Sequence, residues 1–145
     1  METVGTELSD HLKRASDQIQ AQHRRLEPLF EDLSSAITGG SSRDAQTAAF
    51  RLDGAVKAHF LLEEEVVFPA IRGLRPEHQI ELEVLVGDHQ GLGVGLQTVI
   101  DQILKGQLDL AARSLESCRL AIKDHEVREE AFLSGLDSTE SARTL

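Results

Sequence analysis

Apolar residues recur every three or four positions along most of this chain, and they do not alternate with polar ones. Between residues 76 and 105, for example, one face of a helix turning by about 100° per residue would carry Leu82, Leu85, Leu92 and Leu96. The β-branched residues that favour strands are scattered rather than grouped into short runs. This pattern predicts an all-α protein.

Three short groups of turn-forming residues divide the apolar pattern into long segments. They are GGSS at 39–42, GLRP at 73–76 and KG at 105–106. Short connections between long amphipathic helices favour antiparallel neighbours, so we expect an up-down-up-down four-helix bundle. The predicted helices span about residues 7–37, 42–72, 76–105 and 108–134.

The size of the chain fits one compact domain. It has 145 residues with a hydrophobic content of 40%, which is enough for a real core. We expect the bundle to occupy residues 1–136. Residues 137–145, DSTESARTL, show no apolar period, and we expect them to form a disordered tail.

The charge of the chain narrows the choice of partners. Acidic residues outnumber basic ones by 25 to 15, for a net charge of −10, so nucleic acids and anionic membranes would repel most of the protein. Cys118 is the single cysteine and cannot form an internal disulfide, and no apolar run reaches the ~18 residues that a membrane span needs. We expect a soluble, cytoplasmic protein that binds neither nucleic acid nor membrane.

Each predicted helix carries one histidine near its middle, on the face that points into the bundle. These histidines are His23, His59, His89 and His125. In the second helix the predicted inward face of His59 also contains Leu52, Val56, Leu62, Val66 and Ala70.

Two glutamates share these inward faces. Glu63 follows His59 by four residues, and Glu129 follows His125 by four, so each lies one turn from its histidine. Glu64, Glu65 and Glu130 turn to other faces; Glu130 is about 140° from His125. Glu27 repeats the four-residue spacing after His23, either as a ligand or as a group behind the ligands.

The combination favours a metal site over a purely structural role. A single inward histidine is more often an ordinary core residue, but mid-helix residues of an antiparallel bundle meet at one level, so the four imidazoles should converge with the two carboxylates. Burying unpaired carboxylates costs several kcal/mol each, and no Lys or Arg occupies the adjoining inward positions. Imidazole and carboxylate donors together suit first-row transition metals.

In these motifs the chain resembles hemerythrin-like proteins with the HHE cation-binding domain. The resemblance extends from about His11 to Leu136 and includes the stretches HFLLEEEVVFP and HEVRE. It implies two non-haem iron ions, oxo- or hydroxo-bridged, with carboxylates between them and an open position for O₂, NO or peroxide. The ligands that it implies are His23, His59, Glu63, His89, His125 and Glu129.

Two departures from the oxygen-carrying hemerythrins argue against oxygen transport. Those proteins have a second histidine four residues after the one in helix three, where this chain has Gly93, so one iron should lack a ligand. They also use an aspartate five residues after the helix-four histidine, where this chain has Glu130. The spacing to Glu129 is instead similar to that of members linked to nitrosative stress or iron sensing.

The glycines around His89 have two interpretations. Gly93 lies about 40° from His89, so its missing side chain leaves space beside the metal. Gly87, Gly91 and Gly95 form a ridge on the opposite face, which suggests contact with a second subunit and hence a homodimer. Alternatively, neighbouring helices hold this helix in place and the glycines are only tolerated.

Three functions remain open at this stage. The first is a di-iron protein that binds or senses O₂ or NO. The second is a di-iron enzyme that consumes peroxide or NO, and the third is a metal-free interaction bundle. The third leaves Glu63 and Glu129 unexplained, and the ligands alone do not separate the first two.

Overall fold

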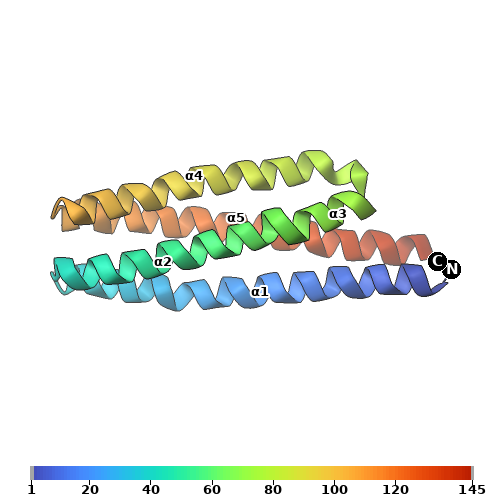
Figure 1. Cartoon of the computed structure of the whole chain (residues 1–145), viewed down its shortest axis with the longest axis horizontal. Helices are drawn as coiled ribbons and strands as arrows, with labels where there is room; N and C mark the ends of the chain where they lie inside the picture. Colours follow the sequence, from blue (N-terminus) through green and yellow to red (C-terminus); the bar gives the residue numbers. More distant parts are fainter. Residues whose placement is uncertain (1, 145) are drawn as a thin grey trace.

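The predicted all-α fold is confirmed by the structure, a computed structural model that describes the backbone of residues 2–144 and the side chains of residues 10–136. Four long rods lie side by side, and the described residues contain no strand (Figure 1). The elements are α1 (Glu2–Thr38), α2 (Ser42–Leu62), the π-helix η1 (Glu63–Val67), α3 (Phe68–Leu74), the 3₁₀ turn η2 (Pro76–His78), α4 (Gln79–Leu104) and α5 (Leu108–Thr144).

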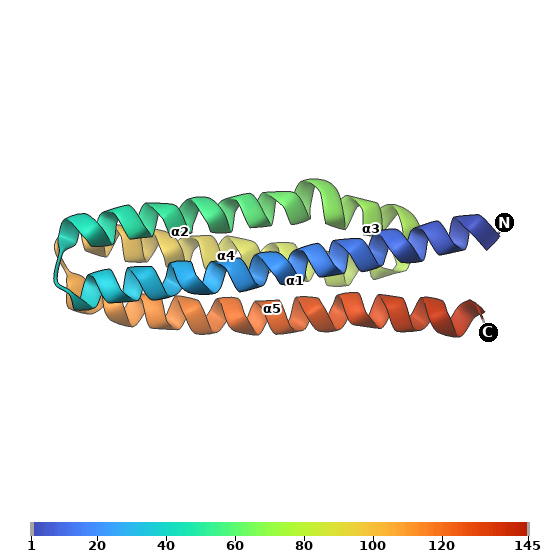
Figure 2. The same cartoon turned by 90° about the horizontal axis from the view of Figure 1, so that it is seen from below.

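The rods run alternately up and down, so that both termini lie at one end (Figures 1 and 2). Around the bundle, α1 packs on α2 and α5, and α4 packs on the same two helices. The order around the bundle is therefore α1, α2, α4, α5 and back to α1. Any layer across its middle receives side chains from four directions.

Local signals in the turns explain where the helices end. The hydroxyl of Ser41 accepts a hydrogen bond from the backbone N–H of Asp44 at 3.2 Å, which caps the start of α2. Gly40 and Gly106 have φ values of 75° and 73°, in the left-handed region that glycine adopts without strain. These turns are short enough to force the antiparallel arrangement.

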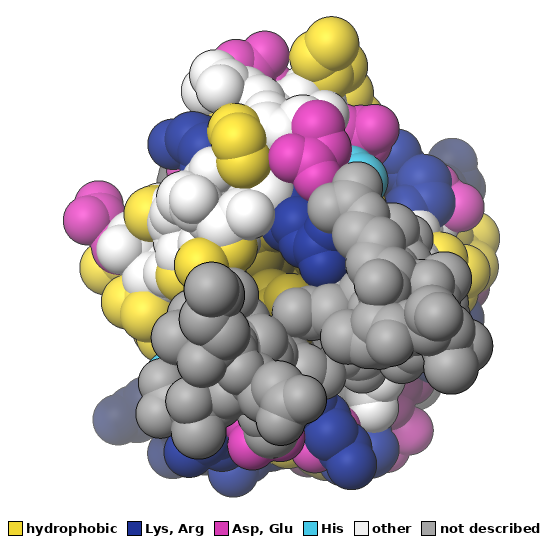
Figure 3. Space-filling model, turned by 90° about the vertical axis from the view of Figure 1, so that its right-hand side faces the viewer, with side chains coloured by type: hydrophobic (Ala, Val, Ile, Leu, Met, Phe, Trp, Pro, Cys, Tyr) yellow, Lys and Arg dark blue, Asp and Glu magenta, His cyan; other side chains and the backbone are white. Residues whose placement is uncertain are grey.

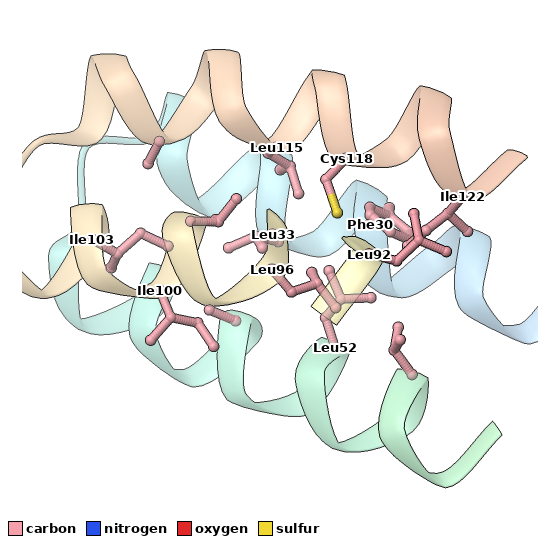
Figure 4. Close-up of a cluster of buried hydrophobic side chains, with 14 of the residues drawn as sticks. Phe30, Leu33, Leu52, Leu92, Leu96, Ile100, Ile103, Leu115, Cys118 and Ile122 are labelled. Atoms are coloured by element: carbon pink, nitrogen blue, oxygen red, sulfur yellow. The ribbon is translucent and has the colours of Figure 1, made fainter. Parts of the chain in front are cut away.

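The hydrophobic core consists of two clusters with a polar layer between them. The loop-end cluster lies toward the turns at Gly40 and Gly106. It comprises Leu26, Phe30, Leu33, Ile37, Ala45, Ala49, Leu52, Val56, Phe60, Leu92, Leu96, Val99, Ile100, Ile103, Ala111, Leu115, Cys118 and Ile122. In Figure 4 its side chains converge from all four rods, with Sγ of Cys118 directed into the same space. The terminal-end cluster comprises Leu12, Ile19, Val67, Phe68, Ile71, Leu82, Leu85, Leu133 and Leu136. The histidines and glutamates of the predicted site lie between these clusters along the helices.

The described surface is of mixed character. Figure 3 looks onto the end of the bundle that carries the termini, where acidic, basic and hydrophobic side chains are interspersed over the described surface. Within the described residues, every helix is either too short or too polar to cross a bilayer. The predicted tail, residues 137–145, lies outside the residues whose side chains are described, and its disorder stays a prediction.

The prediction of one uninterrupted helix over residues 42–72 is wrong, and its inward face changes register at η1. Val66 is 58% exposed and Ala70 is also exposed, although both were expected in the core. Instead Val67, Phe68 and Ile71 are buried, one position later along the chain.

The cause is the wide turn at η1, which is visible between α2 and α3 in Figure 2. The backbone N–H of Phe68 donates to the carbonyl of Glu63, five residues back instead of four. Pro69, the next residue, has no N–H, and its ring would press on the carbonyl of Glu65 in a regular helix. The wider turn inserts one extra residue, so every later side chain shifts by one position.

The register change makes a matched pair of substitutions informative. Val67→Ala should lower the free energy of unfolding by about 2 kcal/mol, because it removes two buried carbon atoms and leaves a cavity. Val66→Ala, the same change at the exposed neighbour, should cost less than about 0.5 kcal/mol. Urea denaturation of both variants in the metal-free state measures the difference. A larger loss of unfolding free energy for Val66→Ala would instead support an uninterrupted helix over residues 42–72.

Candidate metal centre

Six polar side chains meet in the layer between the two hydrophobic clusters. Each is at most 5% exposed, and together they come from all four rods. They are His23 of α1, His59 of α2, Glu63 at the start of η1, His89 of α4, and His125 and Glu129 of α5. These are the six residues that the sequence predicted as ligands, and the fold brings all of them together.

The six side chains form two overlapping groups that could each hold a metal ion. The α1/α2 group contains His23 and His59, and the α4/α5 group contains His89 and His125. Glu63 and Glu129 belong to both groups, and within each group one donor atom per residue lies within 4.8 Å of all the others. The two carboxylates therefore lie within reach of both candidate metal positions.

Each carboxylate directs one oxygen to each group. Oε1 of Glu129 is 3.1 Å from Nε2 of His23, and Oε2 is 3.3 Å from Nε2 of His125. Likewise Oε1 of Glu63 contacts Nε2 of His59, and Oε2 is 3.5 Å from Nε2 of His89. The Nε2 atoms of all four histidines therefore face the two carboxylates.

The other ring nitrogen of each histidine, Nδ1, contacts a side chain on the neighbouring rod. His59 pairs with Gln22, His89 with Glu64 at 3.4 Å, His125 with Asp88 at 3.0 Å and His23 with Glu130 at 3.2 Å. Ionised carboxylates and an amide oxygen can only accept, so Nδ1 donates in each pair. In a neutral imidazole this leaves the lone pair on Nε2, which is the tautomer that a metal requires.

Unsatisfied polar atoms concentrate in this layer. Among the described side chains, seven buried nitrogen or oxygen atoms lack a hydrogen bond, and six of them belong to this cluster. They are Nε2 of His59, His89 and His125, both oxygens of Glu63 and Oε2 of Glu129. Short distances such as that between His59 and Glu63 do not have hydrogen-bonding geometry. Since buried polar atoms are almost always satisfied in proteins, the donor set fits metal cations in this layer.

The ionisation of the cluster without metal follows from its burial and its charges. Burial by itself would lower the pKa of His23, but Glu129, Glu126 and Glu130 together outweigh it and raise that pKa to about 8. The pKa of His125 is also raised, because Glu129 and Asp88 outweigh the effect of burial. Burial would raise the pKa of Glu63, yet the close imidazoles of His59 and His89 hold it well below its usual range. In the metal-free cluster Glu63 therefore keeps its charge, and His23 and His125 hold their protons more tightly than free imidazoles do.

One side of the cluster opens toward the surface between α2 and α4. An opening of about 400 Å³ is lined by His89, Phe60, Leu61, Gly93 and the polar residues Lys57, Glu64 and Gln90. The ring of Phe60 stacks on that of His89 with centroids 3.9 Å apart and an interplanar angle of 8°. A Cβ atom added at Gly93 would meet nothing within 4 Å. The space that the sequence predicted beside His89 is therefore present.

Comparison with known proteins identifies the family. The family model described as hemerythrin HHE cation binding domain matches residues 14–135, most of the chain. The chain belongs to the hemerythrin family. The predicted family is thereby confirmed, together with its cation-binding fold. Comparisons with curated proteins and with solved structures gave no match.

Other residues of this hemerythrin domain lie where the sequence did not settle their roles. Glu27 is turned away from the cluster and pairs at the surface with Lys123 at 3.2 Å and Arg119 at 3.9 Å. Gly87 and Gly91 are exposed, and a Cβ at Gly95 would lie 3.7 Å from Sγ of Cys118. Gly95 thus faces α5 within the same chain, and the subunit contact stays a prediction.

The sequence analysis missed the four side chains that hold the Nδ1 atoms. Each of them is next to a cluster residue in the sequence, and therefore lies about 100° around the helix from it, facing the adjacent rod. A polar residue directly beside each predicted ligand in the sequence was a signal that could have identified them. The adjacent pairs are Gln22 and His23, Glu63 and Glu64, Asp88 and His89, and Glu129 and Glu130.

The stability of the metal-free protein should depend on pH in a defined direction. His23 binds its proton more tightly in the folded state, so its stabilising contribution is complete below its unfolded pKa of 6.5 and is lost as pH rises through about 8. His125 acts in the same direction. We expect a larger free energy of unfolding at pH 6 than at pH 9, measured by urea denaturation with a chelator present.

A control variant assigns this effect to the cluster. His23→Gln should reduce the difference between the two pH values, since the substituted residue has no proton to lose. Greater stability of the metal-free protein at pH 9 than at pH 6 would contradict the assignment.

Proposed function

We propose that this hemerythrin domain holds two iron ions and binds or senses a small ligand, O₂ or NO, at an open iron position. The single observation that carries the proposal is the pair of buried donor groups that share Glu63 and Glu129. Each group offers two imidazoles and two carboxylates, the donor types that non-haem iron accepts.

The residues would divide the work as follows. His23 and His59 would hold one ion, His89 and His125 the other, and the two glutamates would bridge them. Iron ions bound there would supply redox-active Lewis-acid chemistry toward a diatomic ligand. The hydrophobic clusters above and below the layer would keep bulk water out.

The opening at His89 favours ligand binding over turnover. Phe60 and Leu61 lie along it, and their hydrocarbon side chains can neither donate nor accept a proton. Of the titratable groups that line the opening beside His89 itself, Glu64 is engaged with Nδ1 of His89, and Lys57 pairs with Asp53 at 2.8 Å. A dedicated acid or base for peroxide or NO chemistry would need a free polar group here.

Metal analysis combined with ligand titration tests the function. After anaerobic loading with ferrous iron, the protein should contain about two irons per chain, and the optical spectrum should change on addition of NO, O₂ or azide. Less than about half an iron per chain would refute the proposal. Two irons with no spectral response to any of these ligands would refute the ligand-binding part alone.

Two adjacent glutamates provide the matched control. Glu129→Ala should abolish loading, because Glu129 belongs to both donor groups. Glu130→Ala removes only the partner of Nδ1 of His23 and should weaken metal binding by about 10- to 100-fold. Equal losses in the two variants would show that Glu129 has no special role.

The open position should be closed by a new histidine. In Gly93→His the side chain lies one turn from His89, about 6 Å away, within reach of the same metal. We expect the variant to hold iron but to lose most of its azide affinity. Overpacking costs about 1–3 kcal/mol and is checked by denaturation.

Gly93→Ala is the control for this substitution. The space at Gly93 accepts a methyl group without contact, so azide affinity should not change and stability should rise by about 0.5–1 kcal/mol. If folded, iron-loaded Gly93→His binds azide as tightly as the wild type, the open position lies elsewhere.

A further inference from the structure

The four Nδ1 contacts form a closed ring around the bundle. Gln22 of α1 serves His59 of α2; Glu64, one residue past Glu63, serves His89 of α4; Asp88 of α4 serves His125 of α5; and Glu130 of α5 serves His23 of α1. Each rod thus supplies one inward histidine and one outer acceptor for the histidine on the next rod. We call these four contacts the outer ring.

The outer ring is uniform in geometry but not in charge. Three of its acceptors are carboxylates, and Gln22 is the one neutral member. In the α4/α5 group both histidines donate to carboxylates, Glu64 and Asp88. In the α1/α2 group His23 has the carboxylate of Glu130, whereas His59 has only an amide. The inner donors are the same in kind for both groups, so their difference in charge lies in the outer ring.

The charge of the group that accepts from Nδ1–H changes the basicity of Nε2 on the same imidazole. A carboxylate on Nδ1–H draws the proton toward itself and makes Nε2 more basic, and an amide oxygen does so less. A more basic ligand stabilises the higher oxidation state of a metal. The ion in the α1/α2 group would therefore receive less electron density than its partner.

We propose that Gln22 is a positioning residue that makes the two metal positions unequal, with the α1/α2 position the more easily reduced. The proposal rests on the di-iron function above. Gln22 touches neither a metal nor a ligand and acts through Nδ1 of His59. Its effect is electrostatic, so an isosteric change of charge tests it better than truncation.

The first arm of the test uses zinc, which is diamagnetic and needs no redox chemistry. In zinc-loaded protein with ¹⁵N-labelled histidine, proton resonances of four Nδ1–H groups should be resolved, three strongly downfield and that of His59 upfield of them. Gln22→Glu should move the His59 resonance downfield, and Glu64→Gln should move the His89 resonance upfield. Four equivalent resonances, or no movement in Gln22→Glu, would overturn the proposal.

The second arm uses the iron-loaded protein and measures reduction potential. Gln22→Glu should lower the potential of the more easily reduced iron, and Glu64→Gln should raise that of its partner. Gln18→Glu adds the same charge one turn earlier on α1, at an exposed position, and should leave both potentials and all four resonances unchanged. An equal shift in Gln18→Glu would show that net charge alone is responsible, and would overturn the role of Gln22.

The two arms separate this inference from the proposed function. Zinc uptake with the unequal resonances but no iron uptake would refute the di-iron function and leave the outer ring intact. Iron uptake with unchanged potentials in Gln22→Glu would refute the inference and leave the function intact. A chain that binds neither metal would overturn both.

Discussion

The burial of two carboxylates in the middle of a hydrophobic bundle is the constraint on which the rest of this structure depends. Glu63 and Glu129 are fully buried, and an uncompensated carboxylate at such a depth would cost several kcal/mol. Four imidazoles surround them. Of these, His23 and His125 have raised pKa values and provide partial compensation without metal. Cations between the two carboxylates would complete it. The hydrophobic core is consequently divided into two clusters, with the polar layer between them.

The helices around that layer fix the orientation of its imidazole rings. An imidazole is free to turn about its χ2 angle unless its second nitrogen is held, and here each Nδ1 is held from the adjacent rod. Because every contact of the outer ring crosses from one rod to the next, the orientation of each histidine depends on the packing of two helices. Rigid packing of the helices therefore also fixes the geometry of the site.

The π-helix η1 shows how function and local sequence combine. Glu63 opens the wide turn and Pro69 follows directly after it, so the helix carries His59 and Glu63 inward and then shifts its register. The shift buries Phe68, whose ring lies 6.1 Å from that of His89 at 16°. With Phe60 on the same histidine, two aromatic rings stack near His89, beside the opening between α2 and α4.

The sequence by itself determined the helical class, the up-down topology and the six residues of the central layer. These follow from local rules, since a period of 3.6 residues fixes which side chains share a face and short turns fix the direction of neighbours. Tertiary structure decided what depends on neighbouring helices. The register after Glu63 changed because a backbone turn of five residues replaced one of four, which shifts the phase of a pattern without altering the residues. Likewise Gln22, Glu64, Asp88 and Glu130 gained their roles from rods that lie far apart in sequence, and no periodicity within one helix encodes that pairing.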